Sequence, residues 1–298
     1  MAETFVPRQM REDDGTETGE GLLQAVLATP DDVAPRLEYA DWLRARGNPR
    51  GELIFVQCAL ARLGQEEGGA ERGPLLRRES ELLRKHRRAW LEPIFGKRSK
   101  DCELERGFVW RVTMRAAEVA ENLEAIRRVE PVRSVRVTNA DLAPLVASRA
   151  AGLVRALDLR NVQLGARWAR PLFEAETFTS LEELDLVLCH LGRKGAAEIE
   201  AAAPERLPAL HTLHLANNAL GDEGAAILAR APILANLRVL HLGMNGIGLD
   251  GARALVASPH LDHIERLVLW ANPLTERGVR ELRARFHLRL FADPDWET

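Results

Sequence analysis

The sequence predicts an α/β solenoid of stacked strand-and-helix units, preceded by a small all-α module. Two observations predict it. A leucine-patterned template recurs at a nearly constant spacing through the second half of the chain, and the N-terminal part shows helical periodicity. The 298 residues are enough for one large domain or two modest ones with a substantial core.

Composition excludes several classes of protein. The chain is 46% hydrophobic and 29% charged with a net charge of −3. Its overall charge therefore does not favour binding to nucleic acid or to a membrane surface. Cys58, Cys102 and Cys189 match no paired metal or redox spacing, which favours a reducing compartment. The N-terminus lacks the apolar stretch of a secretory signal, and no apolar run approaches the ~20 residues of a membrane span. We therefore expect a cytoplasmic protein without a membrane segment.

The N-terminal third is expected to be helical after a short tail. Residues 1–18 are charged and contain Gly and Thr, so they predict a disordered tail. Residues 19–63 predict a module of three helices: GLLQAVLA, a second helix ending at Gly47, and PRGELIFVQCALARL.

Residues 64–104 predict a linker followed by a basic amphipathic helix that leads into the solenoid. Its clustered arginines raise the alternative of phosphate binding, but Glu79 and Glu81 interrupt the cluster. Its leucines and tryptophan form an apolar face that we expect to pack on the first repeat. A solvated helix is the favoured interpretation, and nucleic acid is not an expected partner.

The repeating template is LxxLxLxxNxL. It matches LEELDLVLCHL at 181–191, LHTLHLANNAL at 210–220, LRVLHLGMNGI at 237–247 and IERLVLWANPL at 264–274, and more loosely VRSVRVTNADL at 132–142 and VRALDLRNVQL at 154–164. The fourth positions are Val135, Leu157, Leu184, Leu213, Leu240 and Leu267, which lie 22, 27, 29, 27 and 27 residues apart.

Each unit combines a strand with a helix. Its core alternates with period two, as in a strand, and a helical run such as DEGAAILARA follows a loop. One unit cannot bury its apolar face alone, so six to eight units are expected to stack over 105–298. The stretch ERGFVWRVTM is expected as the leading strand, and FHLRLFADPDWET as the closing cap.

These features resemble leucine-rich repeats of the ribonuclease-inhibitor-like class, and the resemblance covers residues 105–298. It implies a horseshoe with strands on the concave side. Asn218, Asn245 and Asn272 fill the template asparagine, whose buried side chain can satisfy turn backbone groups. Cys189 takes that place in one repeat, so we interpret it as structural rather than as a nucleophile.

The segment PDDVAPRLEYADWLRARGNPRGELIFVQCAL resembles a bacterial repeat-companion domain, a helical module often found in front of leucine-rich repeats. The resemblance implies architecture and no transferable activity. Its charged positions, Arg36, Asp41, Arg50 and Glu52, could form an interaction surface. The favoured alternative is that they form salt bridges and caps inside a small bundle.

The candidate site lies on the residues that alternate with the template leucines and therefore face outward. One row is Arg136, Asp158, Asp185, His214, His241 and Val268, and the next is Thr138, Arg160, Val187, Ala216, Gly243 and Trp270. Met244 lies beside the second row. The face is expected to change from cationic and polar through acidic and imidazole to apolar.

Three interpretations of Asp158, Asp185, His214 and His241 compete. The favoured one is a protein-binding face with Met244 and Trp270 as anchors. The partner-binding residues are expected to be Arg136, Asp158, Arg160, Asp185, His214, His241, Met244 and Trp270.

The second interpretation is a metal-dependent enzyme, since imidazoles and carboxylates can hold Zn²⁺, but a flat ladder and the lack of a supporting motif oppose it. The third is a surface without a partner. No nucleophile elbow, P-loop, dinucleotide fingerprint or paired-cysteine motif is present. We expect a non-catalytic protein without metal or cofactor that binds another protein. A regulator of a small GTPase or an inhibitor of an enzyme is the alternative form of that function.

Overall fold

The computed structural model describes residues 16–63, 69–287 and 290–291. The expected tail up to residue 15, part of the expected linker (64–68) and most of the closing cap lie outside the described residues. The chain divides into two compact units. Unit 1 comprises residues 1–113 and 122–133, and unit 2 comprises 114–121 and 134–298.

Unit 1 is mainly helical. Its elements are α1 (Thr16–Ala28), α2 (Ala34–Ala45), α3 (Pro49–Leu63), α4 (Gly69–Phe95), the 3₁₀ helix η1 (Gly96–Asp101) and the strands β1 (Cys102–Glu105) and β2 (Phe108–Met114), and α5 (Ala116–Ile126) follows. Two boundaries differ from the sequence-based expectation. Residues 16–18 belong to α1 rather than to a tail, and α4 begins inside the stretch that was expected to be a linker.

The expected leading strand is the second arm of a hairpin. β1 and β2 pair antiparallel, and the pair Glu105 and Phe108 closes a turn of two residues. Both turn residues have positive φ, +50° at Arg106 and +82° at Gly107. Such turns match the twist of the strands they join, which is why they are favoured in hairpins.

Side chains of the N-terminal helices form hydrogen bonds with the backbone of this hairpin turn. Arg36 Nη1 donates to the Arg106 carbonyl at 3.2 Å, and Arg50 Nε donates to the Gly107 carbonyl at 3.0 Å. Gln57 Oε1 accepts from the Gly107 amide at 2.5 Å. A Cβ at Gly107 would lie 2.1 Å from Ile54 Cγ1, so only glycine fits there. Arg36 and Arg50 therefore connect the helices of unit 1 to the hairpin turn of the same unit.

The remaining charged positions of the module differ from each other. Glu52 forms a 2.6 Å ion pair with Arg78 of α4, whereas the Asp41 side chain is exposed and has only a 3.4 Å contact with Arg44. The apolar face of α4 packs through Leu82 on Leu53 and Val56 of α3, within unit 1. Leu104 of β1 packs against the same cluster.

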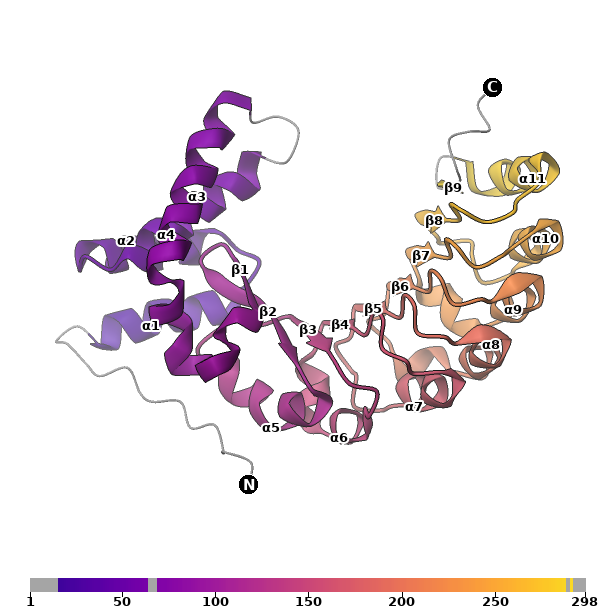
Figure 1. Cartoon of the computed structure of the whole chain (residues 1–298), viewed down its shortest axis with the longest axis horizontal. Helices are drawn as coiled ribbons and strands as arrows, with labels where there is room; N and C mark the ends of the chain where they lie inside the picture. The colour runs from indigo at the N-terminus through magenta and orange to yellow at the C-terminus, as the bar shows by residue number, and fades with distance from the viewer. Residues whose placement is uncertain (1–15, 64–68, 288–289, 292–298) are drawn as a thin grey trace. The chain divides into compact units, whose positions relative to one another are not determined.

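Unit 2 is a stack of strand-and-helix repeats. Its strands are β3 (Ser134–Val137), β4 (Ala156–Asp158), β5 (Glu183–Asp185), β6 (Thr212–His214), β7 (Val239–His241), β8 (Arg266–Val268) and β9 (Leu290–Phe291). Each of these strands pairs in parallel with the next. Within this unit the strands line one side and the helices the other (Figure 1).

The helical side follows the same order along the chain. It comprises α6 (Ala143–Val146), η2 (Arg149–Leu153), η3 (Ala166–Trp168), α7 (Ala169–Phe173), α8 (Gly192–Glu200), η4 (Pro204–Arg206), α9 (Gly221–Leu228), η5 (Pro232–Asn236), α10 (Leu249–Ala257) and α11 (Glu276–Phe286). The template leucines fill the space between the two sides. Leu184, Leu213, Leu240 and Leu267 are fully buried and pair in register across β5 to β8.

The template asparagines satisfy the turns of neighbouring repeats. Asn245 Nδ2 donates to the carbonyls of Leu215 and Leu242 at 2.9 and 3.0 Å, and its Oδ1 accepts from the Asn218 amide at 2.9 Å. Cys189, at the same template position, is fully buried, and its Sγ donates to the Leu159 carbonyl at 3.1 Å. Burial raises the pKa of the Cys189 thiol to about 12, which agrees with a structural role.

Among the helices that the structure describes, none is long and apolar enough to cross a bilayer.

Candidate functional site

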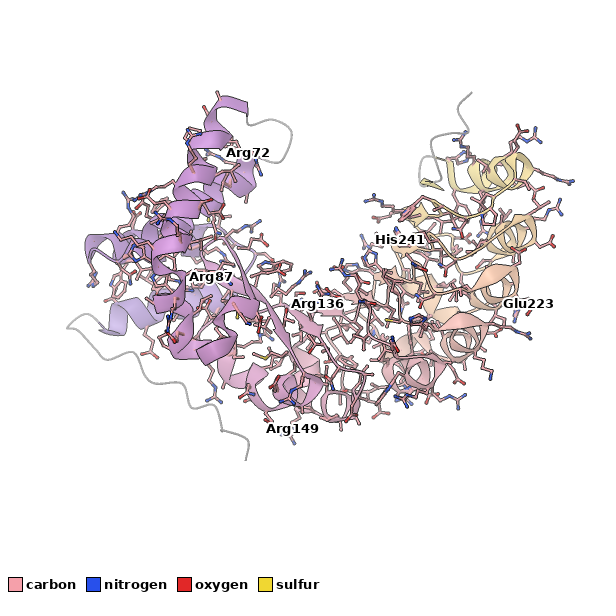
Figure 2. The ribbon with its side chains drawn as sticks, in the orientation of Figure 1. Arg72, Arg87, Arg136, Arg149, Glu223 and His241 are labelled. Atoms are coloured by element: carbon pink, nitrogen blue, oxygen red, sulfur yellow. The ribbon has the colours of Figure 1, made fainter. Side chains whose placement is uncertain are left out.

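The candidate site is the outward row of the parallel strands, here called the ladder. Its members are Arg136, Asp158, Asp185, His214, His241 and Val268, and each is paired with the next by strand register. Neighbouring strands lie about 4.8 Å apart, so adjacent side chains along the row are in reach of each other. Figure 2 shows Arg136 and His241 on the strand side of unit 2 and Glu223 on the helical side.

Two carboxylates of the ladder are joined by one arginine. Arg160 Nη2 lies 2.9 Å from Asp158 Oδ2, and Arg160 Nε lies 3.1 Å from Asp185 Oδ2. Each aspartate also caps its own strand end, since Asp158 accepts from the Arg160 amide and Asp185 from the Val187 amide, both at 3.0 Å. Arg160 keeps 43% of its side chain exposed, so the guanidinium, not the aspartates, is the solvent-facing part.

The expectation that Asp158 contributes to an exposed face is wrong. Asp158 is only 3% exposed, because it bonds the amide and the guanidinium of Arg160 and turns away from solvent. Burial alone would raise the pKa of Asp158, but the hydrogen bonds from Arg160 outweigh it and hold the pKa below its ordinary value. Asp158 is therefore an ionised counter-charge that orients Arg160.

The pKa of Asp185 is shifted in the opposite direction, above its ordinary value. Burial raises its pKa, and the Val187 amide, His214 and Arg160 offset this only in part. The pKa of Arg160 is raised, chiefly by its hydrogen bond to Asp158. The two aspartates thus differ in acidity although they occupy equivalent positions in adjacent repeats.

Two imidazoles and an indole continue the ladder. The ring centroids of His214 and His241 are 5.9 Å apart, and those of His241 and Trp270 are also 5.9 Å apart. Glu183 Oε1 lies 3.4 Å from His214 Nε2. The pKa of His241 is lowered by burial and, to a smaller degree, by the neighbouring charges of His214 and Arg266.

Trp270 is held in a defined orientation. Its Nε1–H donates to His241 Nε2 at 2.9 Å, with the rings at 71° to each other. Nε2 can accept only when it carries no proton, so neutral His241 is protonated on Nδ1. A Cβ at Gly243 would lie 3.0 Å from Cε2 and Nε1 of the indole, so the ring lies directly against the glycine backbone.

Trp270 and Met244 form an exposed apolar pair. They are 40% and 44% exposed, and the Met244 amide donates to the Trp270 carbonyl at 3.0 Å. Only two other large hydrophobic residues of the described ranges, Val33 and Leu76, are exposed to a similar degree. Met244 has a φ of +56°, an unfavourable conformation for a residue with a side chain, of the order of 1 kcal/mol. Exposed apolar groups with a polar rim often mark interaction sites.

Most of the predicted residues therefore lie on one face, with Asp158 buried beneath Arg160. Sequence reasoning missed Glu183, the supporting role of Gly243, and Arg266. Glu183 could have been found from the sequence, because the position directly before a template leucine faces outward in an alternating strand. In the described part of the chain, no three His, Cys, Asp or Glu side chains converge in a way that could hold a metal ion.

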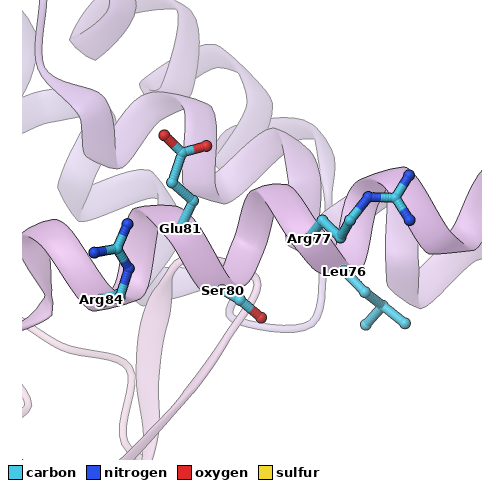
Figure 3. Close-up of a pocket in the computed structure, with 5 residues that line it drawn as sticks. All are labelled: Leu76, Arg77, Ser80, Glu81 and Arg84. Carbon is cyan, nitrogen blue, oxygen red and sulfur yellow. The ribbon is translucent and has the colours of Figure 1, made fainter.

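A second surface lies on α4 in unit 1. A shallow depression is lined by Leu76, Arg77, Ser80, Glu81 and Arg84, all from that one helix (Figure 3). Arg78 and Arg88 of the same helix pair with glutamates at 2.6 and 2.9 Å. The basic residues are thus interleaved with acidic partners, and one helix alone does not enclose a ligand.

A family model described as Leucine Rich repeat matches residues 179–199, 207–229 and 234–256. These segments contain β5, β6 and β7 with most or all of the helices α8, α9 and α10 that follow them. These three segments are therefore similar to leucine-rich repeats, which are generally protein-interaction modules. A comparison with curated proteins gave no match.

Proposed function

We propose that this chain is a non-catalytic interaction protein whose ladder face binds another protein. The observation that carries the proposal is the exposed pair Met244 and Trp270, placed beside an ordered row of charged and imidazole groups. Aromatic residues and methionine are enriched in interfaces, and charged groups around them orient the partner.

The support of the indole strengthens this assignment. His241 and Gly243 already fix the Trp270 ring before a partner arrives. Ordering a side chain on binding costs about 0.5–1.5 kcal/mol, and this cost is largely avoided when the free protein holds the bound orientation. Trp270 is therefore the residue whose removal should weaken binding most.

The finer assignments are proposals on the same basis. The spacing of 27–29 residues between the later repeats supports a ribonuclease-inhibitor-like horseshoe, and the resemblance of residues 30–60 supports a bacterial companion module. The same proposal includes the division of the chain into a tail, a helical module, a leading helix and the repeats. It also includes a cytoplasmic location. Inhibition of an enzyme and regulation of a small GTPase are two forms that such binding could take.

Affinity capture from native cell extract tests the proposal. The baits are the wild-type chain, a Met244→Ser/Trp270→Ala double variant, and a matched control with Arg193→Ala/Glu223→Ala. The control removes an exposed 2.7 Å ion pair from the helical side of the same unit. We expect a protein captured by wild type and control but lost by the double variant. Equal capture by all three baits, or no captured protein, would contradict the proposal.

A further inference from the structure

The sulfur-containing side chains that the structure describes differ widely in their exposure to solvent. Met244 is 44% exposed, whereas Met114 of β2 is only 6% exposed. The other two methionines, Met1 and Met10, lie outside the described residues. All three cysteines are buried. Among the described side chains that contain sulfur, Met244 is therefore the one that dissolved reagents can readily reach.

The three cysteines are protected from oxidation by burial as well as by protonation. Cys58, Cys102 and Cys189 are 8%, 3% and 0% exposed. Burial raises the pKa of the Cys58 thiol, and it raises the pKa of the Cys102 and Cys189 thiols to about 12. Peroxides attack the thiolate, which these groups do not form at neutral pH. A thioether carries no proton and needs no ionisation, so exposure favours Met244 over the thiols as the site of attack.

Met244 also belongs to the surface on which the proposed function depends. Its amide donates to the Trp270 carbonyl at 3.0 Å, so the two residues are neighbours on adjacent repeats. Trp270 is 40% exposed, and the uncharged residues Ala271 and Pro273 that follow it are exposed as well. A polar group introduced at Met244 would therefore lie beside the exposed indole.

We propose that Met244 is an oxidation site and that its sulfoxide weakens partner binding at the ladder face. The co-reactant is a peroxide such as hydrogen peroxide. One peroxide oxygen bonds to the sulfur as the O–O bond breaks, and the other oxygen leaves as water. The sulfur loses two electrons, and the peroxide gains them.

The product changes the chemistry of the anchor. The sulfoxide oxygen is a hydrogen-bond acceptor that would lose its hydration against an apolar partner surface without gaining a donor. Methionine sulfoxide reductases reverse the step by oxidising two thiols to a disulfide and releasing water, so the modification is reversible. The effect on binding rests on the proposed function, whereas the site of oxidation is independent of it.

Peroxide treatment of the full chain followed by peptide mass spectrometry tests the site. Met244 lies in the tryptic peptide 239–253, which contains no other sulfur atom. We expect Met244 to be oxidised about tenfold faster than the buried Met114, with the cysteines unmodified over the same time. Circular dichroism before and after treatment shows whether the chain stays folded. Equal rates for the two methionines, or thiol oxidation that precedes oxidation of Met244, would overturn the inference.

Affinity capture from native cell extract tests the consequence for binding. The baits are the wild-type chain, Met244→Leu, which has no sulfur at this position, and Met244→Gln, whose polar side chain resembles the sulfoxide. Each bait is compared with its own untreated sample, so that the effect of peroxide is measured rather than basal binding. We expect the oxidised wild type to capture about tenfold less partner and to recover after treatment with reductases for both sulfoxide epimers. Peroxide should have no effect on capture by Met244→Leu, and untreated Met244→Gln should capture as little as the oxidised wild type.

The outcomes separate this inference from the proposed function. Equal capture by oxidised and untreated wild type would overturn the inference and leave the proposed function standing. A peroxide effect of the same size in Met244→Leu would place the effective oxidation elsewhere and would also overturn it. If no untreated bait captures a partner, the proposed function is contradicted together with the effect on binding, while mass spectrometry alone still decides the site of oxidation.

Discussion

Lowering the pH should release Trp270 from its fixed orientation. The indole N–H donates to His241 Nε2 at 2.9 Å, and a proton on that nitrogen removes the acceptor. A neutral hydrogen bond contributes about 1 kcal/mol net, so its loss changes the population of the held orientation about fivefold. The imidazolium would also be repelled by the positive charge of Arg266, while the carboxylates of Glu183 and Asp185 lie beyond the His214 ring.

The sign of the pH dependence follows from the lowered pKa of His241. The unfolded chain takes up this proton at the ordinary pKa of about 6.5, whereas the folded chain takes it up only at lower pH. The contribution of this group to stability is therefore complete above about pH 6.5 and is lost as the pH falls towards the lowered pKa. The indole should remain bonded at neutral pH and be released within that acidic window.

Nuclear magnetic resonance of the ¹⁵N-labelled indoles measures this transition. The chain has six tryptophans, and Trp270→Phe identifies the signal of interest. We expect that signal to move with a midpoint below pH 6.5 and to become independent of pH in His241→Phe, which lacks the acceptor. A Trp270 signal that stays constant between pH 8 and the onset of acid unfolding, or one with a midpoint above 6.5, would refute this reasoning.

Two further substitutions probe the support of the face. Asn245→Ala leaves the Asn218 amide without its acceptor and removes one of the two side-chain amide donors from the Leu215 and Leu242 carbonyls, so we expect a loss of about 2–3 kcal/mol in the free energy of unfolding by urea denaturation. Asn236→Ala, which removes one bond of 3.1 Å, should cost only about 1 kcal/mol, and equal losses would contradict the role of the buried template amide. Gly243→Ala places a Cβ 3.0 Å from the indole, so it should displace Trp270 and weaken partner binding with a change in stability of about 1 kcal/mol or less. A loss of binding no larger than that of an exposed helical-side change such as Glu223→Ala would argue against the indole as an anchor.

The repeating part of the fold was predictable because the template leucines recur at a nearly constant spacing in the sequence. The leucine spacing fixed which residues alternate, and the strand register then placed Asp185, His214 and His241 side by side as that alternation requires. The burial of Asp158 was not predictable, because equivalent positions in adjacent repeats carry the same residue. The difference arises from Arg160, whose long side chain reaches both carboxylates.

The interactions of the N-terminal module were also beyond sequence reasoning. Arg36, Arg50 and Gln57 contact a turn that lies 50 to 70 residues further along the chain. No local pattern specifies such a partner, and a charged side chain on a helix is more often solvated than buried. The hairpin itself had a local signal, since Arg106–Gly107 stands between two strand-forming segments.

Site-specific photo-crosslinking tests the central claim most directly. A photoreactive phenylalanine analogue is placed at the exposed Met244, beside Trp270, or at Glu223, which is exposed on the helical side. Both proteins are irradiated in native cell extract and compared by mass spectrometry. Our account predicts a defined crosslinked protein from position 244 that is absent from position 223 and is lost when Trp270→Ala is added. The same products from both positions, or from neither, would contradict a partner-binding ladder face.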